Sequence, residues 1–196
     1  KNGERALLDK ILNYLVLINN KVGVDLAKKI TLSKNMTISI TGLKSLCFYG
    51  SEPPLDLLNK FYTKWKDHSL VIEKWFELMS SLNIEEKGLK FIKNLLSHES
   101  FEYKNPNKIR SVLGSFQKEN VLLFHANDSS GYNFISKQVS FIDENNPQAA
   151  ARLVLPLTRF SNYDEIRKNK MKKALQNISN KPISTDLSEI VNKALR

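Results

Sequence analysis

The stretch ENNPQAAARLVLPLTR, residues 144–159, predicts a helix that begins at Asn146 and carries its polar side chains on one face. An Asn before a Pro suits a helix start, because its side chain can accept from free N–H groups of the first turn. At 100° per residue, Gln148, Arg152 and Arg159 lie within about 40° of one another. The opposite, packing face is apolar: Ala149, Ala150, Leu153, Val154 and Leu157.

The polar edge of this helix indicates a surface that faces a ligand. Gln148 and Arg152 are one turn apart at the positive end of the helix, where free backbone N–H groups favour anions. The alanines between them leave room for a ligand. Pro156 has no N–H and crowds the carbonyl of Arg152, so we expect a bend there. The spacing predicts a helix end that recognises an anion or an amide. The alternative, which stays open, is that these arginines bind no ligand and lie on the protein surface with the aliphatic parts of their side chains flat against it.

A second helix, expected over residues 106–119, has a similar arrangement. Its Arg110 lies about 100° away from the centre of the packing face. That face is built from Ile109, Val112, Leu113 and Phe116. Arg110 is therefore a second candidate for contact with a ligand.

Helical spacing continues over nearly the whole chain, so the sequence predicts an all-α protein. The first segment has apolar residues at three-to-four spacing from Leu7 to Ile18. MTISIT at 36–41 alternates like a strand but merges into a helical pattern. Short helices with short loops imply antiparallel neighbours in a superhelical, armadillo- or HEAT-like stack. Further helices are expected at about 35–49, 54–66, 69–82, 85–96, 131–144, 164–178 and 185–195.

The stack is expected to form one helical domain over residues 1–196. The segments 105–107 and 124–132 separate a looser amino-terminal half from a carboxyl-terminal half that is richer in motifs. Capping side chains are expected before four of the helices: Ser51, Asn105, Asn146 and Asp164.

The composition favours a protein that binds neither nucleic acid nor membrane. The net charge is +10, but the basic residues are 24 Lys and only 6 Arg. Arg is the residue that donates paired hydrogen bonds to phosphates and stacks on bases, so a lysine-rich chain is a weaker candidate for binding nucleic acid. No apolar run approaches the roughly 18 residues of a membrane span. The lone Cys47 cannot form an internal disulfide and is expected as a buried thiol. With no visible secretion signal, this cysteine usage indicates the cytoplasm.

The helix expected at 164–178 is basic around an apolar stripe. This combination permits a membrane-surface interpretation. Because the stripe holds no Trp or Phe, a solvated surface helix is the favoured interpretation. The stripe consists of Ile166, Met171, Ala174, Leu175 and Ile178.

The chain contains no recognisable active site or metal site. His68, His98 and His125 have no second ligand at metal-binding spacing, and no nucleophile elbow or phosphate-binding glycine loop occurs. His98 near a helix end suits a cation, whereas His125 is expected to order its loop through a hydrogen bond. The Glu85-Glu86 pair falls in the first turn of an expected helix, where the helix dipole accounts for it.

Three motifs, taken in order, resemble one known family. They are NPNKIRSVLGSF at 105–116, FHANDSSGY at 124–132 and NPQAAARLVLPLTR at 146–159. Together they look like the carboxyl-terminal domain of the bacterial aminopeptidase N family, the zinc-dependent gluzincin aminopeptidases. The resemblance runs from about residue 35 to the end. Ser129 stands where relatives of this family usually show glycine.

The resemblance implies an all-helical superhelical domain that covers the mouth of a thermolysin-like catalytic domain. It implies that Gln148 lies at the rim of the first specificity pocket, that Arg152 faces the carboxyl-terminal side of a peptide, and that Arg110 also lines the cavity. The Zn²⁺ of the family is held by H-E-x-x-H and a downstream Glu, which this sequence lacks. The chain by itself is therefore expected to bind no metal and to be inactive.

The first hypothesis is thus the cap domain of a cytoplasmic, monomeric metallo-aminopeptidase. Its partners would be a peptide substrate and the catalytic domain of the same enzyme. A start at Lys1 rather than Met suggests a piece of a longer protein. The alternative is a free-standing helical-repeat scaffold whose lysines bind an acidic protein or a nucleic acid.

Overall fold

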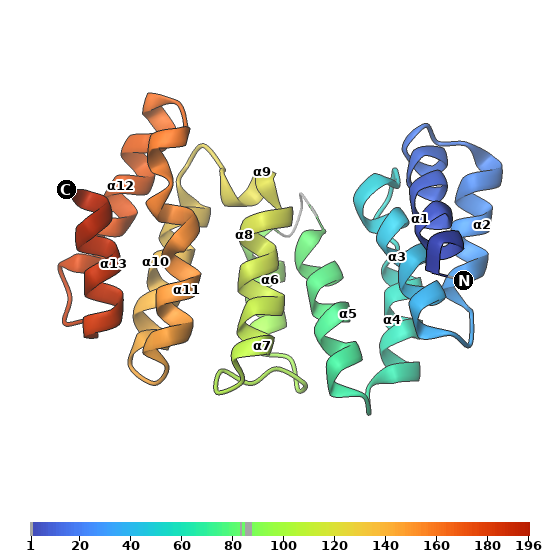
Figure 1. The fold of residues 1–196 in the computed structure, drawn as a ribbon, viewed down its shortest axis with the longest axis horizontal. Helices are drawn as coiled ribbons and strands as arrows, with labels where there is room; N and C mark the ends of the chain where they lie inside the picture. Colours follow the sequence, from blue (N-terminus) through green and yellow to red (C-terminus); the bar gives the residue numbers. More distant parts are fainter. Residues whose placement is uncertain (1, 83, 85–87) are drawn as a thin grey trace. The chain divides into compact units, whose positions relative to one another are not determined.

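The computed structural model describes residues 2–82, 84 and 88–196, and helices make up most of this part of the chain (Figure 1). No strand occurs among the residues described, which confirms the all-α class. The chain divides into two compact units, residues 1–84 and 85–196. The division therefore falls at residue 84 and not at 105–107 or 124–132. A single folding domain over residues 1–196 stays a prediction.

The first unit stacks short helices against their neighbours in the chain. Its helices are α1 (Asn2–Leu17), α2 (Lys21–Thr31), α3 (Met36–Tyr49), α4 (Leu55–Trp65) and α5 (Ser69–Ser81). The MTISIT stretch lies in α3, as the helical interpretation of it expected. The core of this unit includes Leu12, Ala27, Leu46, Leu58 and Phe76.

Helix α2 was not predicted from the sequence. It begins where the Asn20 side chain accepts from the backbone N–H of Gly23 at 3.1 Å. Its fully buried residues are small, namely Gly23, Ala27 and Thr31, and its larger apolar residues Val24 and Ile30 pack against the same core while only partly buried. A Cβ on Gly23 would lie 2.3 Å from Cβ of Leu15, which shows how closely α1 and α2 pack.

One expectation in the first unit needs correction. Ser51 does not cap α4, whose N-cap is Pro54 with no side-chain hydrogen bond. His68 occupies the N-cap position of α5 but makes no capping hydrogen bond. Cys47 is half-buried, and burial raises the pKa of its thiol to about 12, so the thiol stays protonated at neutral pH.

The second unit contains the three motifs at 105–116, 124–132 and 146–159. Its helices are α6 (Gly88–Leu96), α7 (Pro106–Ile109), the π-helix η1 (Arg110–Gly114), α8 (Ser115–Glu119), α9 (Val121–Phe124), α10 (Ser130–Asp143), α11 (Pro147–Thr158), the 3-10 turn η2 (Phe160–Asn162), α12 (Glu165–Ser179) and α13 (Thr185–Leu195). The π-helix, α9 and η2 were not predicted. Residues 85–87, which include the Glu85-Glu86 pair, lie outside the described part of the chain.

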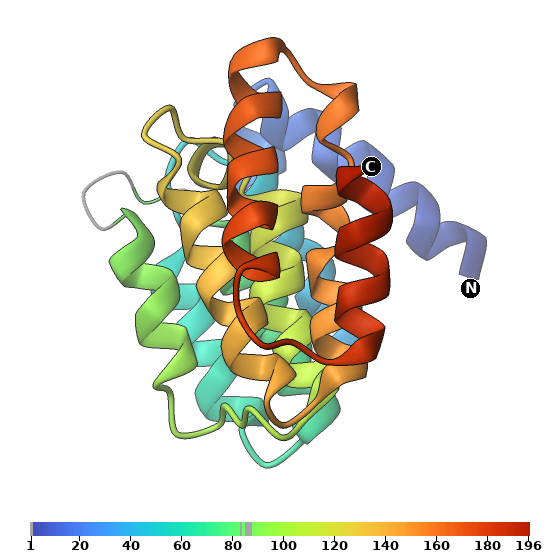
Figure 2. The ribbon, with the colours of Figure 1, turned by 90° about the vertical axis from the view of Figure 1, so that its left-hand side faces the viewer.

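Helices α10 to α13 pack in two layers, with α12 and α13 side by side in front of α10 and α11 (Figure 2). The buried side chains of these helices are aromatic and aliphatic and include Tyr132, Ile135, Val154 and Leu175. Most of the apolar stripe of α12 is buried, but Ile166 is 67% exposed. The exposed Ile166 lies in the first turn of α12, at one end of the stripe.

Candidate functional site

A cavity of about 1190 Å³ lies in the second unit. Its walls come from the α7–η1–α8 run, from α9 and the loop after it, from α11, and from the start of α12. Figure 1 shows the α7–η1–α8 run and α11 with their chains pointing the same way. The two helical runs that the sequence singled out thus line the same cavity.

Arg110, Gln148 and Arg152 all line this cavity, and all three residues are exposed. Arg110 comes from the wall made by η1, whereas Gln148 and Arg152 come from α11. The structure therefore brings together residues that are about 40 positions apart in the sequence. Their contact with a ligand stays a prediction.

The start of α11 is built as its sequence indicated. The Asn146 side chain accepts from the N–H of Ala149 at 3.0 Å, which confirms this cap. Ala150, Val154 and Leu157 are fully buried, so the opposite stripe with Gln148 and Arg152 faces the cavity.

The helix α11 continues through Pro156 to Thr158. The buried side chain of Gln117 on α8 donates from Nε2 to the carbonyl of Leu153 at 3.0 Å. This bond joins the two walls of the cavity beside the proline. The sequence had not singled out Gln117, because its partner lies 36 positions away.

Arg110 sits at the first position of the π-helix. The backbone N–H of Ser115 donates to the carbonyl of Arg110, five residues back, as expected for a π-helix. Val112 and Leu113 are buried, which anchors this turn. The preceding cap is confirmed, since the Asn105 side chain accepts from the N–H groups of Asn107 and Lys108. π-bulges occur frequently at functional sites.

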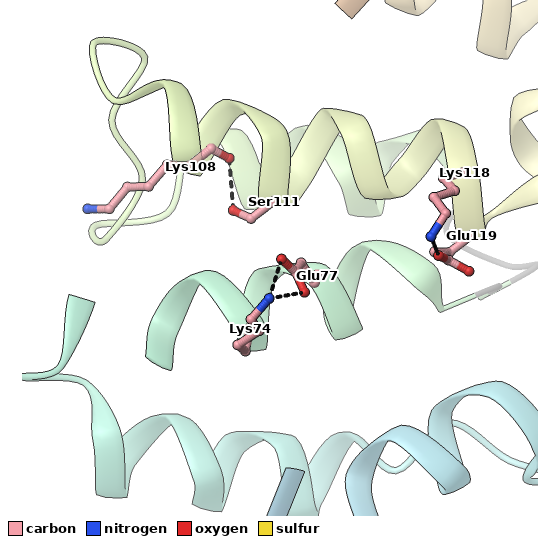
Figure 3. Close-up of polar contacts among 6 residues, drawn as sticks. All are labelled: Lys74, Glu77, Lys108, Ser111, Lys118 and Glu119. Carbon is pink, nitrogen blue, oxygen red and sulfur yellow. Dashed lines mark hydrogen bonds and ion pairs between the residues drawn. The ribbon is translucent and has the colours of Figure 1, made fainter. Parts of the chain in front are cut away.

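The cavity lining is strongly cationic. Among the described residues that line it, the cations are Arg110, Lys118, Arg152, Arg159 and Arg167, and the one carboxylate is Asp164. Lys118 pairs with Glu119 at 2.8 Å (Figure 3), and Arg167 pairs with Asp164 at 2.6 Å. Within the described ranges, no ion pair involves Arg110, Arg152 or Arg159. An anionic ligand would therefore meet guanidinium groups that are not already neutralised.

Arg159 and Arg167 were not predicted as site residues. Arg159 shares the polar stripe of Gln148 and Arg152, so the helical spacing already contained the signal for it. Arg167 comes from another helix, α12, and its place at the cavity depends on how α12 packs. The Asp164 side chain caps α12 by accepting from the N–H of Arg167 at 3.0 Å, which confirms that expected cap.

The loop after α9 is held by a hydrogen bond from the predicted residue His125. Its Nδ1 lies 2.6 Å from the hydroxyl oxygen of Tyr132, which confirms the expected loop-ordering bond. Burial, together with the charge of Arg167, lowers the pKa of His125, and burial raises the pKa of Tyr132 to about 12. Both groups are therefore neutral at pH 7. Tyr163 packs against the imidazole of His125 with ring centroids 4.8 Å apart.

The residues described hold no group of three or more His, Cys, Asp or Glu side chains that could bind a metal ion. His98 does not act as the expected cation, because burial lowers its pKa and its Nδ1 accepts from the N–H of Ser100 at 3.1 Å. Across these same residues, every helix is too short or too polar to cross a membrane.

Comparisons with known proteins cover the whole chain. Residues 1–196 match the family described as a domain of unknown function (DUF3458_C) with ARM repeats. The chain is 37% identical over 194 residues to aminopeptidase N of Haemophilus influenzae and 34% identical over 195 residues to aminopeptidase N of Escherichia coli K12. Each alignment covers 98% of this chain and 22% of the relative. The chain thus spans about a fifth of the length of these curated relatives.

A solved structure shows the same fold. The crystal structure of Legionella pneumophila aminopeptidase A in complex with aspartic acid is similar with a TM-score of 0.84 and 28% sequence identity. The similarity covers 97% of this chain and 23% of that one. Together with the ARM-repeat description, it confirms the armadillo-like fold class expected from the sequence.

Proposed function

Because the chain belongs to the DUF3458_C family of ARM-repeat domains, as a C-terminal domain of aminopeptidase N, we propose that it lines the peptide-binding cavity of a zinc-dependent aminopeptidase. The enzyme would remove amino-terminal residues from peptides. This domain would confine and orient the peptide and would restrict access to the catalytic site. The observation that carries the proposal is the convergence of Arg110, Gln148 and Arg152 on one cavity.

The chemistry of these three side chains suits a peptide. The Gln148 amide can both donate to a peptide carbonyl and accept from a peptide N–H. The guanidinium groups of Arg110 and Arg152 can each donate two parallel hydrogen bonds to a carboxylate. A short peptide carries one carboxylate at its carboxyl terminus, so Arg152 is the residue that we assign to it, with Arg110 on the facing wall.

The catalytic machinery would belong to the rest of the enzyme. The described residues lack a cluster that fits Zn²⁺, so its ligands would lie outside this chain. A bound zinc ion would supply an activated water for attack on the first peptide bond. We therefore expect the 196-residue chain alone to hydrolyse no peptide. We further propose that the parent enzyme is cytoplasmic and monomeric and binds neither nucleic acid nor membrane.

An exposed apolar stripe in the first unit supports contact with the rest of the enzyme. Leu7, Ile11, Tyr14 and Ile18 are 60%, 48%, 69% and 68% exposed. On a helix these positions span about 60°, so Leu7, Ile11 and Tyr14 form one apolar strip along α1, and Ile18 directly follows the end of that helix. Contiguous apolar surface of this kind marks interaction sites. The remaining four fifths of the enzyme's length is the partner that we propose for it.

The test uses the full-length enzyme and an Arg152→Ala substitution. We expect KM for tri- and tetrapeptides to rise about tenfold with little change in kcat, because Arg152 would contribute to binding and not to the chemical step. Lys137→Ala, which removes an exposed cation of α10 that does not line the cavity, is the matched control. Unchanged KM values for both peptide lengths in the Arg152 variant would rule out this role.

A further inference from the structure

The cavity holds more unpaired positive charge than a short peptide can neutralise. Arg110, Arg152 and Arg159 line it, and no ion pair of any of them is found in the part of the chain that the structure describes. The carboxyl terminus of a tripeptide supplies a single carboxylate, which two facing guanidinium groups can bind together. That arrangement uses Arg110 and Arg152 and leaves Arg159 without an anion.

Arg159 lies further along the same wall. The rise of 1.5 Å per residue puts it about 16 Å from Gln148 and about 10 Å from Arg152 along α11. An extended peptide advances about 3.3 Å per residue. If the first residue of a peptide lies beside Gln148, Arg152 is level with about the third residue and Arg159 with about the sixth.

The wall between the two arginines is apolar. Leu155 and Pro156 line it on α11, and Leu155 is 41% exposed. Val121 and Leu122 of α9 line the cavity as well, and they are 52% and 70% exposed. A peptide that followed this wall would therefore place uncharged residues between two carboxylate-binding positions.

We propose that Arg159 is a second carboxylate-binding residue, which recognises longer peptides that carry a negative charge at about the sixth residue. The charge can be the terminal carboxylate of a hexapeptide or the side chain of Glu or Asp. This inference rests on the proposed function and extends its substrate class to acidic peptides of about six residues. Tyr163, four residues after Arg159, also lines the cavity, and its ring packs against that of His125.

A purely structural role for Arg159 gives a different expectation. Arg159 occupies the C-cap of α11, where a cation stabilises the helix dipole. Loss of that role would lower stability and would change KM for every peptide alike. Carboxylate recognition would change KM only for peptides that carry the charge at the right distance.

The experiment compares Arg159→Gln, Arg159→Lys and the control Lys137→Gln in the full-length enzyme. The peptides are alanine-based: a tripeptide acid, a hexapeptide acid, the hexapeptide amide, and the hexapeptide amide with Glu at position six. We expect Arg159→Gln to raise KM roughly fivefold for the hexapeptide acid and for the Glu-containing amide. The tripeptide acid and the plain amide should keep their KM. Arg159→Lys keeps the positive charge at the C-cap but loses the planar guanidinium that can donate two parallel hydrogen bonds. It should therefore raise the same two KM values, but by less than Arg159→Gln does.

The outcomes separate this inference from the proposed function. A rise in KM for the hexapeptide acid alone supports the inference and shows that Arg159 binds the carboxyl terminus. A rise in KM for both charged hexapeptides also supports it and shows that Arg159 binds side-chain carboxylates as well. Equal KM changes for all four peptides, or none for any of them, overturn the role of Arg159. If Arg152→Ala still raises KM for tripeptides in that case, the proposed function stands without the second carboxylate site. If that effect is absent too, both fail.

Discussion

Nδ1 of His125 lies 2.6 Å from the hydroxyl oxygen of Tyr132, which ties the loop at 125–129 to the first turn of α10. Tyr132 is fully buried, and the ring of Phe124 packs edge-on against it with centroids 5.3 Å apart. Arg167 and Asp164 are the charged groups that act on His125 from α12 and its cap. The loop thus forms its end of the cavity around a neutral imidazole.

This relationship predicts that the protein loses stability as the pH falls below about 6.5. The pKa of His125 is lowered in the folded state, mainly by burial, so the unfolded chain binds a proton at a higher pH than the folded one does. Stability therefore rises with pH between the folded pKa and the unfolded pKa, and it is fully present above that range. His98, whose pKa burial also lowers, contributes in the same direction.

Urea unfolding of the chain between pH 5 and pH 8 measures this dependence. His125→Asn removes the titrating group and should flatten the curve in part, leaving the share due to His98. His68→Asn serves as the control, because His68 lies at the start of α5, outside this loop. A wild-type unfolding free energy that stayed constant from pH 8 to pH 5 would contradict the assignment of neutral, buried histidines.

Ser129 has a φ of 66°, in the left-handed region where glycine is favoured. It precedes α10 and makes no capping hydrogen bond with its side chain, so a glycine would lose no such bond. We expect Ser129→Gly to raise the free energy of unfolding by about 0.5–1 kcal/mol. The control is Ser140→Gly inside α10, where glycine should lower it by a similar amount. A urea midpoint that moved down for both variants would show that the loop does not hold Ser129 in this conformation.

Gly131 packs against the backbone of α9 more closely than any other residue type would allow. A Cβ there would lie 2.4 Å from the carbonyl oxygen of Phe124 and 2.5 Å from that of Leu123. We expect Gly131→Ala to destabilise the protein by about 1–3 kcal/mol, because backbone atoms have to move. It should also raise KM in the full-length enzyme, since Phe124 lines the cavity.

Gly114→Ala is the matched control for that substitution. Its Cβ would meet Cγ of Arg110 at 3.4 Å, an ordinary contact with a flexible side chain. An alanine in this helical turn should leave stability unchanged or raise it by up to about 1 kcal/mol. Thermal and urea unfolding of both variants would test the comparison, and equal losses from the two would contradict the close approach at Gly131.

Much of the local structure followed from short-range rules. The caps at Asn105, Asn146 and Asp164 were predicted correctly, because each requires only a side chain and the turn that follows it. The polar stripe of α11 followed from the helical repeat alone. The sequence also placed Arg110 off the packing face of its helix, although it did not indicate the π-helix that begins there.

The failures came from packing and not from local preference. Helix α2 was missed because the residues that it buries fully are glycine, alanine and threonine, small side chains whose burial depends on the close approach of neighbouring helices. The apolar stripe of α12 was predicted as one face, yet its Ile166 is exposed while the rest is buried, because a stripe on one helix does not say how far its partners extend. Ser51 resembled a cap by its place before two prolines, yet α4 starts at Leu55.

The amino-acid sequence by itself determined that this protein is helical, where its best-capped helices begin, and which side chains share the exposed edge of α11. These properties depend on a repeat of 3.6 residues and on contacts within one turn. Only the tertiary structure decided that Arg110 and Arg152 line the same cavity and that Arg159 and Arg167 join them. Those positions depend on how separate helices pack, through contacts such as that of Gln117 with Leu153, 36 positions apart, which no local rule specifies.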